Sequence, residues 1–192
     1  MSDFDRDKWN AKYSDMSFAP TEPSTVLTGL VEYLPSRGRA LDIAGGAGRN
    51  AIWLAQRGLN TTLADISVVG LKLARERAAA TGVKIETLEI DLEQQPLPEG
   101  PFDLITSVCY LGRGLFPQFP RLLVEQGILI AIQPTRKNLE RHEKPPFDFL
   151  YEEGELRSLV TGLEILHYGE SWSADDRHDA VLVARKPALP VV

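Results

Sequence analysis

Cysteine and histidine are scarce in this chain of 192 residues, which has one cysteine and three histidines. A single cysteine, Cys109, excludes an internal disulfide and a cysteine-rich zinc cluster. The three histidines are scattered, and none belongs to a His-Glu-x-x-His pair on one helix face. We therefore expect a protein without a bound metal.

Long apolar runs, a basic leader and an excess of positive charge are also absent. The aliphatic stretch at 128–132 is far too short to span a bilayer, and the first ten residues are acidic and polar. The 21 Lys and Arg residues are outnumbered by 27 Asp and Glu, which gives a formal net charge of −6. The basic run at 136–144 is diluted by acids and is interpreted as a solvated loop. We expect a cytoplasmic protein with neither a nucleic-acid nor a membrane partner.

The composition is that of a globular domain. Hydrophobic residues make up 43% of the chain and charged residues 25%, which suffices for a packed core at this length. We expect a single domain over residues 1–192, acting as a monomer or a homodimer. Within it, residues 1–23 are expected to form an N-terminal cover segment, and residues 24–187 the core.

Apolar patterns of helical and strand type alternate along the core. Helices are expected at 24–34, 49–57, 67–81, 115–124 and 152–161, and strands at 39–44, 60–65, 84–90, 102–110, 127–133, 163–170 and 179–185. Ser24 and Ser67 are placed as helix N-caps. This alternation predicts an α/β protein with a Rossmann-like, doubly wound, mostly parallel sheet of seven strands. The last two strands have no helix between them and should pair as an antiparallel C-terminal hairpin.

The strongest local motif is Leu-Asp-Ile-Ala-Gly-Gly-Ala-Gly-Arg-Asn at 41–50, where a strand passes into a helix. Open α/β sheets bind ligands at such junctions. Gly46 and Gly48 let the backbone turn tightly and approach a ligand closely. The helix that begins near Arg49 directs free N–H groups toward that ligand. A purely structural turn is the alternative for the glycine cluster taken alone.

Acidic residues at strand ends strengthen the ligand-binding interpretation. Asp65 closes the second strand about twenty residues after the glycines, where a carboxylate accepts hydrogen bonds from ribose hydroxyls. Asp91 closes the third strand, and Asp103 opens the fourth. Each acid alone is explained by a helix cap or a solvated turn. Together with Asp42, the four acids are hard to explain by packing.

Over residues 9–185 the chain resembles the class I S-adenosylmethionine-dependent methyltransferases. It is most similar to their small-molecule branch, which includes tellurite-resistance-type and thiol-type enzymes. The family's first motif, an acid followed by spaced glycines, reads Asp-Ile-Ala-Gly-Gly-Ala-Gly at 42–48. Ala44 stands where the family has its first glycine, which removes little room.

The resemblance implies S-adenosylmethionine as cofactor and in-line transfer of its methyl group to a small-molecule acceptor. Asp65 falls on the family's ribose-binding acid, and Asp91 and Leu92 on its adenine-contacting pair. Cys109 and Tyr110 match positions that line the methionine half. The residues assigned to the cofactor are Trp9, Tyr13, Asp42, Ala44, Gly46, Gly48, Asp65, Ile66, Asp91, Leu92, Cys109 and Tyr110.

The chemistry of this ligand agrees with the acids. S-adenosylmethionine has a ribose diol, an adenine amine, an ammonium and a sulfonium, and it has no phosphate, so carboxylates suit it better than a pyrophosphate. Trp9, Tyr13 and Tyr110 could face the sulfonium through cation–π attraction. For Trp9 and Tyr13 the alternative is a hydrophobic staple that fixes the N-terminal segment.

Two other function classes stay open. The pattern Gly46-x-Gly48-x-x-Ala51 also satisfies the fingerprint of a nicotinamide-dependent oxidoreductase. Asp42 inside the first strand, Asp91, and the lack of a Tyr-x-x-x-Lys pair argue against that class. The second alternative is a non-catalytic module that binds S-adenosylmethionine as a sensor or scaffold.

The sequence identifies no catalytic base. Methyl transfer from a charged leaving group depends mainly on positioning and desolvation, and a soft acceptor needs little deprotonation. Arg113, just past the fourth strand, is the substrate-side candidate, because a guanidinium holds a carboxylate or an oxyanion. The alternative is an ion pair with a surface acid such as Glu152 or Glu170. His142 and His178 are weaker candidates for a base.

Overall fold

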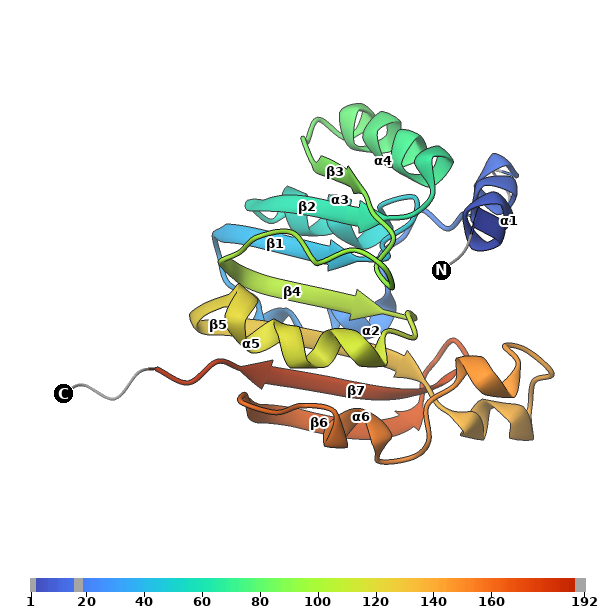
Figure 1. The fold of residues 1–192 in the computed structure, drawn as a ribbon, viewed down its shortest axis with the longest axis vertical. Helices are drawn as coiled ribbons and strands as arrows, with labels where there is room; N and C mark the ends of the chain where they lie inside the picture. The colour runs from blue at the N-terminus through green and yellow to red at the C-terminus, as the bar shows by residue number, and fades with distance from the viewer. Residues whose placement is uncertain (1–2, 16–18, 189–192) are drawn as a thin grey trace.

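The computed structural model describes residues 3–15 and 19–188, which contain a seven-stranded sheet of order β3-β2-β1-β4-β5-β7-β6 (Figure 1). The strands are β1 (Gly38–Ile43), β2 (Leu59–Asp65), β3 (Glu86–Glu89), β4 (Phe102–Val108), β5 (Leu123–Pro134), β6 (Glu164–Trp172) and β7 (His178–Arg185). Strands β1 to β5 are parallel, and β7 is antiparallel to both β5 and β6. The α/β class, the seven-stranded sheet and the antiparallel C-terminal hairpin are confirmed.

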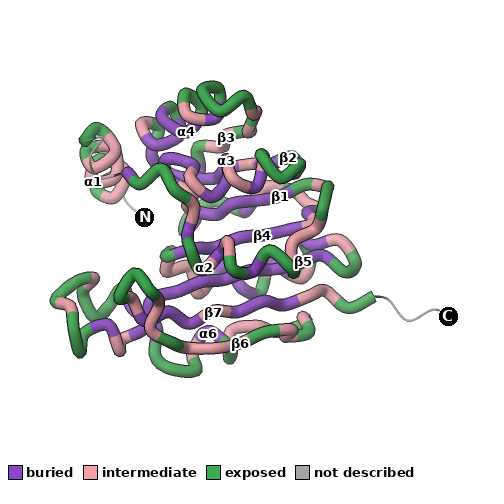
Figure 2. Tube along the Cα trace, turned by 180° about the vertical axis from the view of Figure 1, so that it is seen from behind, coloured by how far each residue is buried: buried purple, intermediate pink, exposed green. Residues whose placement is uncertain are grey.

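The core lies on both faces of the central strands, which are buried along most of their length (Figure 2). Leu104 and Ile130 belong to one buried cluster, whereas their chain neighbours Ile105 and Leu129 belong to another. Successive side chains of a strand point to opposite faces, so apolar runs of this kind need cover on both sides. The sequence of β4 and β5 is nearly continuously apolar because both faces of these strands are buried.

Helices and short 3₁₀ turns cover the sheet. The helices are α1 (Asp3–Ser14), α2 (Thr25–Thr28), α3 (Arg49–Gln56), α4 (Val68–Ala80), α5 (Phe119–Leu122) and α6 (Glu155–Ser158). The 3₁₀ turns are η1 (Val31–Tyr33), η2 (Arg113–Gln118), η3 (Arg136–Glu140) and η4 (Phe147–Phe149). Helices α3 and α4 lie where the sequence predicted them, and Ser67 caps α4 by accepting a hydrogen bond from the Gly70 N–H at 3.0 Å. Residues 1–2 and 16–18 of the expected cover segment lie outside the described residues.

Three expected helices are much shorter than predicted. The segment 24–34 forms only the single turn of α2 and the turn η1, although Ser24 caps α2 as expected. Its threonines, valines and Gly29 favour helix weakly, so packing of Leu27 and Leu30 into the core holds the turn in place of a long helix.

Proline and glycine explain the other two shortened helices. The segment 115–124 is split between η2, α5 and the start of β5, because Pro117 and Pro120 lack the N–H that a longer helix requires. The segment 152–161 contains only α6, which begins after Gly154. Gly154 has a φ of 79°, outside the helical region, and therefore sets the first turn. No helix in the described residues is long and apolar enough to cross a membrane.

Candidate functional site

A small cavity of about 60 Å³ lies at the edge where β1, β2 and β4 end, beneath α1. Figure 1 shows the arrowheads of these strands pointing toward that helix. The cavity is lined by Trp9, Tyr13, Ala44, Asp65, Ile66, Leu92, Cys109 and Tyr110. All eight belong to the twelve residues that the sequence assigned to a cofactor. Asp42, Gly46, Gly48 and Asp91 complete the twelve and do not line it.

The glycine loop between β1 and α3 depends on left-handed backbone. Ala44, Gly46 and Gly48 have φ values of 52°, 57° and 83°. A Cβ on Gly48 would lie 2.7 Å from the Cβ of Ala74, and one on Gly46 would overlap the Tyr13 hydroxyl. The room left by Gly46 is thus filled by Tyr13 from α1. Ala44 is the one of the three that is not glycine, and the left-handed conformation costs a residue with a Cβ about 1–2 kcal/mol.

Asp65 ties the glycine loop to the start of α4. Its Oδ2 accepts a hydrogen bond from the Gly46 N–H at 2.8 Å, and its Oδ1 accepts one from the Ser67 N–H at 2.8 Å. Burial raises the pKa of Asp65, whereas these hydrogen bonds oppose the rise. An ionised carboxylate has about four lone-pair sites, so two remain for donors that enter the cavity.

Asp42 lies beneath the loop and away from the cavity. It is fully buried, and its Oδ1 accepts a hydrogen bond from the Thr106 hydroxyl at 2.7 Å. A Cβ on Gly45 would overlap the Leu63 side chain and the Asp42 carboxylate, which explains why the first glycine of the motif has no side chain. Burial raises the pKa of Asp42 to about 6, against the opposing effects of Thr106 and Arg49.

The two remaining acids lie at opposite ends of the sheet. Asp91 follows β3 near the cavity, and its Oδ1 accepts a hydrogen bond from the Glu93 N–H at 3.0 Å. Asp103 lies at the start of β4, on the far edge, where it accepts a hydrogen bond from the Arg39 N–H at 2.7 Å. The prediction that grouped Asp103 with the other acids was wrong. Asp103 lies at the amino end of its strand, whereas the cavity lies at the carboxyl ends of the parallel strands.

The chain turns sharply where β4 ends at the cavity wall. Cys109 has a φ of 58°, and this left-handed residue ends the strand at Val108, earlier than predicted. Its backbone N–H donates a hydrogen bond to the Ile132 carbonyl at 2.8 Å. The residue is exposed at the cavity, and desolvation by the surrounding wall raises the pKa of its thiol. Burial also raises the pKa of Tyr110, whose hydroxyl has no hydrogen-bond partner among the described residues.

Helix α1 forms the outer wall, although none of its residues is buried. Its Trp9 and Tyr13 rings stack with centroids 5.9 Å apart, and both line the cavity. The Asn10 side chain holds the helix in place, because its Oδ1 accepts a hydrogen bond from the Ser67 hydroxyl at 2.7 Å. Tyr13 also packs against the small cluster of Ala47 and its neighbours, so the staple and the cavity-lining interpretations both describe it.

Arg49 is the residue that sequence reasoning missed. It opens α3 and is half-buried, and it has no hydrogen bond or ion pair within the described residues. Its charge lowers the pKa of Tyr13, Asp42 and Cys109, so it lies near all three. A cation at a helix N-terminus faces the positive end of the macrodipole. An arginine directly after the glycine turn was therefore a signal for a nearby anion.

Arg113 is held in an ion pair, whereas the sequence offered it as a substrate-side candidate. Its Nη2 donates to Glu155 Oε2 at 2.9 Å and to the Leu150 carbonyl at 3.3 Å. Its guanidinium also lies 4.6 Å from the centroid of the Tyr151 ring. The alternative of an ion pair is right in kind, but its named partners were wrong.

The two acids named for Arg113 have other partners. Glu152 pairs with Arg136, and Glu170 accepts hydrogen bonds from the Tyr168 hydroxyl and from the Gly154 N–H. Arg113 pairs instead with Glu155, because the fold brings α6 next to η2. The spacing of these residues along the sequence does not reveal that contact.

Neither histidine named as a weak candidate base lines the cavity. His142 contacts the Asp176 carbonyl through Nε2 at 2.6 Å. His178 is buried, and its Nδ1 lies 2.7 Å from the Thr135 hydroxyl oxygen. Over residues 3–15 and 19–188, no group of three or more His, Cys, Asp or Glu side chains is placed to hold a metal ion.

Known proteins match this chain over its central part. Residues 40–127 match a family model described as a methyltransferase domain. The demethylmenaquinone methyltransferase of Thermus thermophilus is 39% identical over 70 residues, which are 35% of this chain and 32% of that protein. The ribosomal protein L11 methyltransferase of the same species is 34% identical over 119 residues, 60% of this chain and 46% of that protein. The chain thus spans a third to a half of the length of these relatives.

The fold has a close counterpart among solved structures. TehB from Haemophilus influenzae superposes with a TM-score of 0.73 at 20% identity, covering 94% of this chain and 66% of that one. At this identity the likeness establishes the fold alone. The chain is thus similar in sequence to a methyltransferase domain over residues 40–127, which are less than half of its length, and similar in fold to TehB.

Proposed function

We propose that this chain binds S-adenosylmethionine in the cavity beneath α1 and transfers its methyl group to a small-molecule acceptor. One observation carries the proposal. Eight residues from segments far apart in the sequence line one cavity, at the edge of the sheet where β1, β2 and β4 end. Open α/β sheets bind ligands at this edge.

The residues present fit the parts of this cofactor. Asp65 keeps free lone pairs toward the cavity and would accept hydrogen bonds from the ribose hydroxyls. Ile66 and Leu92 offer apolar walls for the adenine, with Asp91 nearby for its amine. Arg49, which has no partner in the described part of the chain, would pair with the carboxylate of the methionine half.

The aromatic wall suits the cationic centre. Trp9, Tyr13 and Tyr110 line the cavity, and a ring face attracts a cation by about 0.5–2 kcal/mol, most when water is excluded. When bound, the cofactor supplies an electrophilic methyl group on a sulfonium with a neutral leaving group. The chain's own residues orient that group and shield it from water.

No group in the cavity wall is suited to act as a base at neutral pH. The lone pairs of Asp65 that its two backbone bonds leave free are assigned to the ribose hydroxyls, and desolvation raises the pKa of Cys109, Tyr13 and Tyr110, which keeps the thiol and the hydroxyls protonated. The acceptor would therefore bring a nucleophilic atom that is already deprotonated or carries a free lone pair, such as a thiolate or an oxyanion.

The acceptor class is argued from the charge of the chain and from the segments around the cavity. A formal charge of −6 and short rim segments favour a small molecule over a nucleic acid. The matched relatives include proteins named for a quinone precursor, for a ribosomal protein and for ribosomal RNA, so kinship leaves the class open.

Turnover against a panel of acceptors tests the proposal. The panel contains thiols, selenium and tellurium oxyanions, small carboxylates, a short RNA and a protein extract, each with labelled S-adenosylmethionine. Methylation of a small molecule supports the proposal, and labelling confined to RNA or protein refutes its acceptor class. Cofactor binding without turnover on any acceptor favours a non-catalytic module, and NADH binding in its place favours an oxidoreductase.

The N-terminal segment is proposed to cover the cofactor. Because α1 buries none of its residues yet supplies Trp9 and Tyr13 to the cavity, Trp9→Ala should lower turnover at least about tenfold. It should cost little thermal stability, since the ring is only partly buried. Phe4→Ala is the matched control on the same helix, because Phe4 is 73% exposed. Equal losses of turnover and of stability in Trp9→Ala would reduce the segment to ordinary packing.

A further inference from the structure

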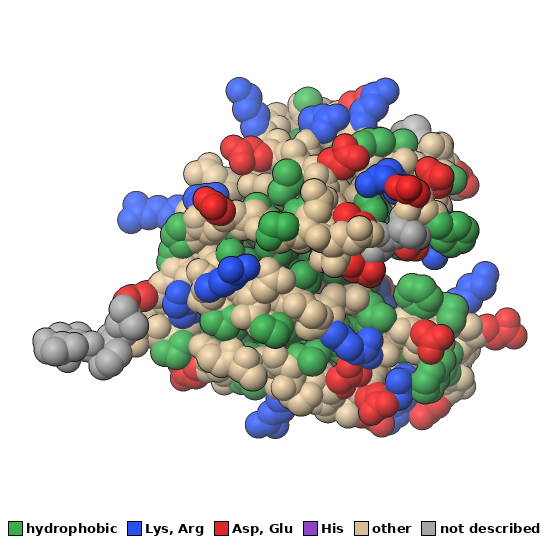
Figure 3. All heavy atoms as spheres, in the orientation of Figure 1, with side chains coloured by type: hydrophobic (Ala, Val, Ile, Leu, Met, Phe, Trp, Pro, Cys, Tyr) green, Lys and Arg blue, Asp and Glu red, His purple; other side chains and the backbone are tan. Residues whose placement is uncertain are grey.

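Exposed aromatic rings and lysines border the mouth of the cavity from two sides. One side is α1, and the other is the segment 134–154, which follows β5. Figure 3 shows the molecule notched between these two parts. Phe147 and Phe149, in η4, are each 51% exposed, which is unusual for phenylalanine in two nearby positions.

The two sides approach each other through a lysine and a phenylalanine. The Nζ of Lys8, on α1, lies 5.4 Å from the centroid of the Phe149 ring. On the same helix, the Nζ of Lys12 lies 4.5 Å from the centroid of the Trp9 ring, and Trp9 lines the cavity. Aromatic faces and ammonium groups therefore alternate from the cavity wall to the outer rim.

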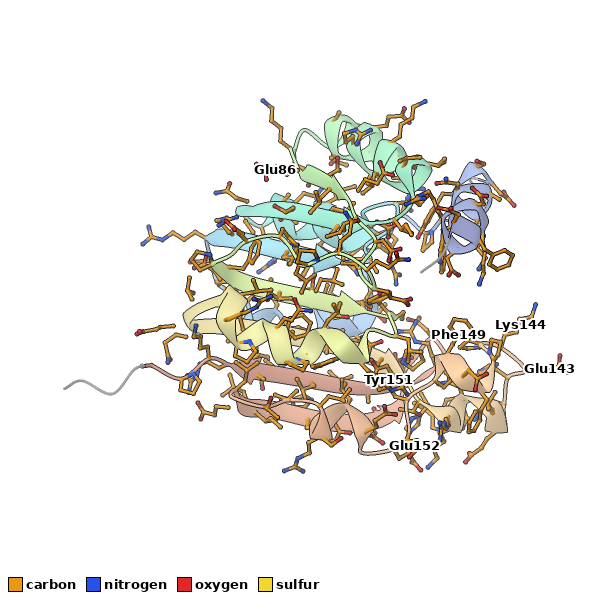
Figure 4. The ribbon with its side chains drawn as sticks, in the orientation of Figure 1. Glu86, Glu143, Lys144, Phe149, Tyr151 and Glu152 are labelled. Atoms are coloured by element: carbon orange, nitrogen blue, oxygen red, sulfur yellow. The ribbon has the colours of Figure 1, made fainter. Side chains whose placement is uncertain are left out.

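Lys144 adds a third cation from the opposite side. Figure 4 shows Lys144 and Phe149 on the part of the 134–154 segment that faces α1, with Glu143 at the outer tip of the loop. Lys8 and Lys144 lower the pKa of Lys12, after the larger effect of its burial, so the three ammonium groups lie within reach of one another.

This concentration of like charge is unfavourable for the folded chain alone. Within the described residues, neither Lys8 nor Lys144 has a carboxylate partner. The other cations of this segment differ, because Arg136 pairs with Glu152 and Lys137 with Glu153. In a protein of formal charge −6, Lys8 and Lys144 therefore keep ammonium groups that an anion at this rim could contact.

We propose that the methyl acceptor is a small amphipathic anion, whose flat apolar body packs against Phe149 and Trp9 and whose anionic group lies between Lys8 and Lys144. The inference rests on the proposed function and specifies its acceptor. Ring faces at the mouth take a planar apolar body, and lysine ammonium groups act as point charges for a carboxylate or a phosphate. An RNA strand would need a longer basic track than three lysines on an acidic chain.

Binding of matched probes tests the inference on the full chain saturated with S-adenosylhomocysteine. The probes are 2-naphthoate, its uncharged analogue 2-naphthamide, naphthyl phosphate and a short single-stranded RNA, titrated by calorimetry. We expect 2-naphthoate to bind at least about tenfold more tightly than 2-naphthamide, and we expect the ratio to shrink as salt is raised. Naphthyl phosphate distinguishes a phosphate site from a carboxylate site by its rank relative to 2-naphthoate.

Single substitutions assign the effect to the named residues. Lys8→Gln and Lys144→Gln should each weaken 2-naphthoate several-fold and leave 2-naphthamide and S-adenosylhomocysteine unchanged. Phe149→Ala should weaken all three naphthyl probes. Lys84→Gln is the matched control, because it removes the same charge from an exposed lysine just before β3 at the far end of the sheet.

Several results would overturn the inference. They are equal affinity for 2-naphthoate and 2-naphthamide, a loss in Lys84→Gln as large as that in Lys144→Gln, and tighter binding of the RNA than of any naphthyl probe. Failure of S-adenosylhomocysteine to bind would instead overturn the proposed function. In that case a higher affinity for 2-naphthoate than for 2-naphthamide, measured on the chain alone, would show an anion site at this rim, but the site would not be that of a methyl acceptor.

Discussion

The two halves of the carboxyl edge are held together in different ways. In the half formed by β1, β2 and β4, buried carboxylates bind backbone N–H groups and a buried hydroxyl, as Asp65 does with Gly46 and Asp42 with Thr106. In the half formed by β5, β6 and β7, buried hydrogen bonds of Asn138 fix the base of the segment 134–154, whereas its outer part carries partly exposed pairs such as Arg136–Glu152. Buried hydrogen bonds are costly to break, whereas exposed ion pairs contribute about 0–1 kcal/mol.

This difference separates the side proposed to hold the cofactor, which is rigid, from the side proposed to take the acceptor, whose outer part is more adaptable. A loop whose Gly46 N–H is held by a buried carboxylate resists rearrangement, because that hydrogen bond must break first. A rim held by long side chains in water rearranges at small cost, and it tolerates substitutions that alter the acceptor. Substitutions in the two halves should therefore differ in size as well as in kind.

Asp65→Ala should have the largest effect. It leaves the N–H groups of Gly46 and Ser67 without acceptors, at about 1–3 kcal/mol each, and removes the proposed partner of the ribose. We expect a loss of about 4 kcal/mol in the free energy of unfolding, measured by urea denaturation. Asp103→Ala is the control, because it leaves the Arg39 N–H without its acceptor at the opposite edge of the sheet. It should destabilise the fold without weakening cofactor binding.

Asp42 should give the rigid half a measurable pH dependence. Its folded pKa of about 6 lies above the unfolded value of 3.8, so the folded state binds more protons between these limits. The free energy of unfolding should therefore fall as pH rises from about 4 to about 6, by on the order of 3 kcal/mol from this group.

Asp42→Asn isolates that contribution, because the amide oxygen still accepts from Thr106 and carries no charge. Urea denaturation at pH 4 and pH 7 should show a smaller decline with pH in the variant than in the parent chain. Parallel declines in the two proteins would show that Asp42 is not the source.

Ala44→Gly should stabilise the chain by about 1 kcal/mol. The substitution relieves the left-handed strain at Ala44, whose φ is 52°, although glycine gives back some unfolded-state entropy. Ala47→Gly is the comparison within the same loop, because Ala47 packs in the cluster with Leu73 and has no positive φ. The midpoint temperature of thermal unfolding should rise for Ala44→Gly and fall for Ala47→Gly. A fall for both variants would show that Ala44 is not strained.

Arg113→Leu should have the smallest effect. The Arg113 side chain is 36% exposed and its partner Glu155 is 19% exposed, so the pair contributes less than about 1 kcal/mol. Cofactor affinity should not change, because Arg113 lies outside the cavity wall. A double-mutant cycle with Glu155→Gln, followed by urea denaturation, measures the pair itself. A rise in the KM of the acceptor without a change in the free energy of unfolding would instead indicate that Arg113 contacts the substrate.

The same division describes what the sequence could and could not predict. The positions of β1, α3, β2 and α4 depend on local patterns, and the turns at Gly46 and Gly48 depend on conformations that glycine favours, so the rigid half was predictable from neighbouring residues. The short turns η2 and α5 were not, because Pro117 and Pro120 break a helical apolar pattern. The Arg113–Glu155 pair and the approach of Lys8 to Phe149 join segments far apart in the chain. Only the fold brings them together.

Calorimetric titration with S-adenosylhomocysteine tests the central claim most directly. The parent chain should bind one equivalent, Asp65→Ala should bind at least about tenfold more weakly, and Asp103→Ala should bind as the parent does. Absence of binding to the parent chain, or an equal loss in both variants, would contradict the placement of the cofactor beneath α1.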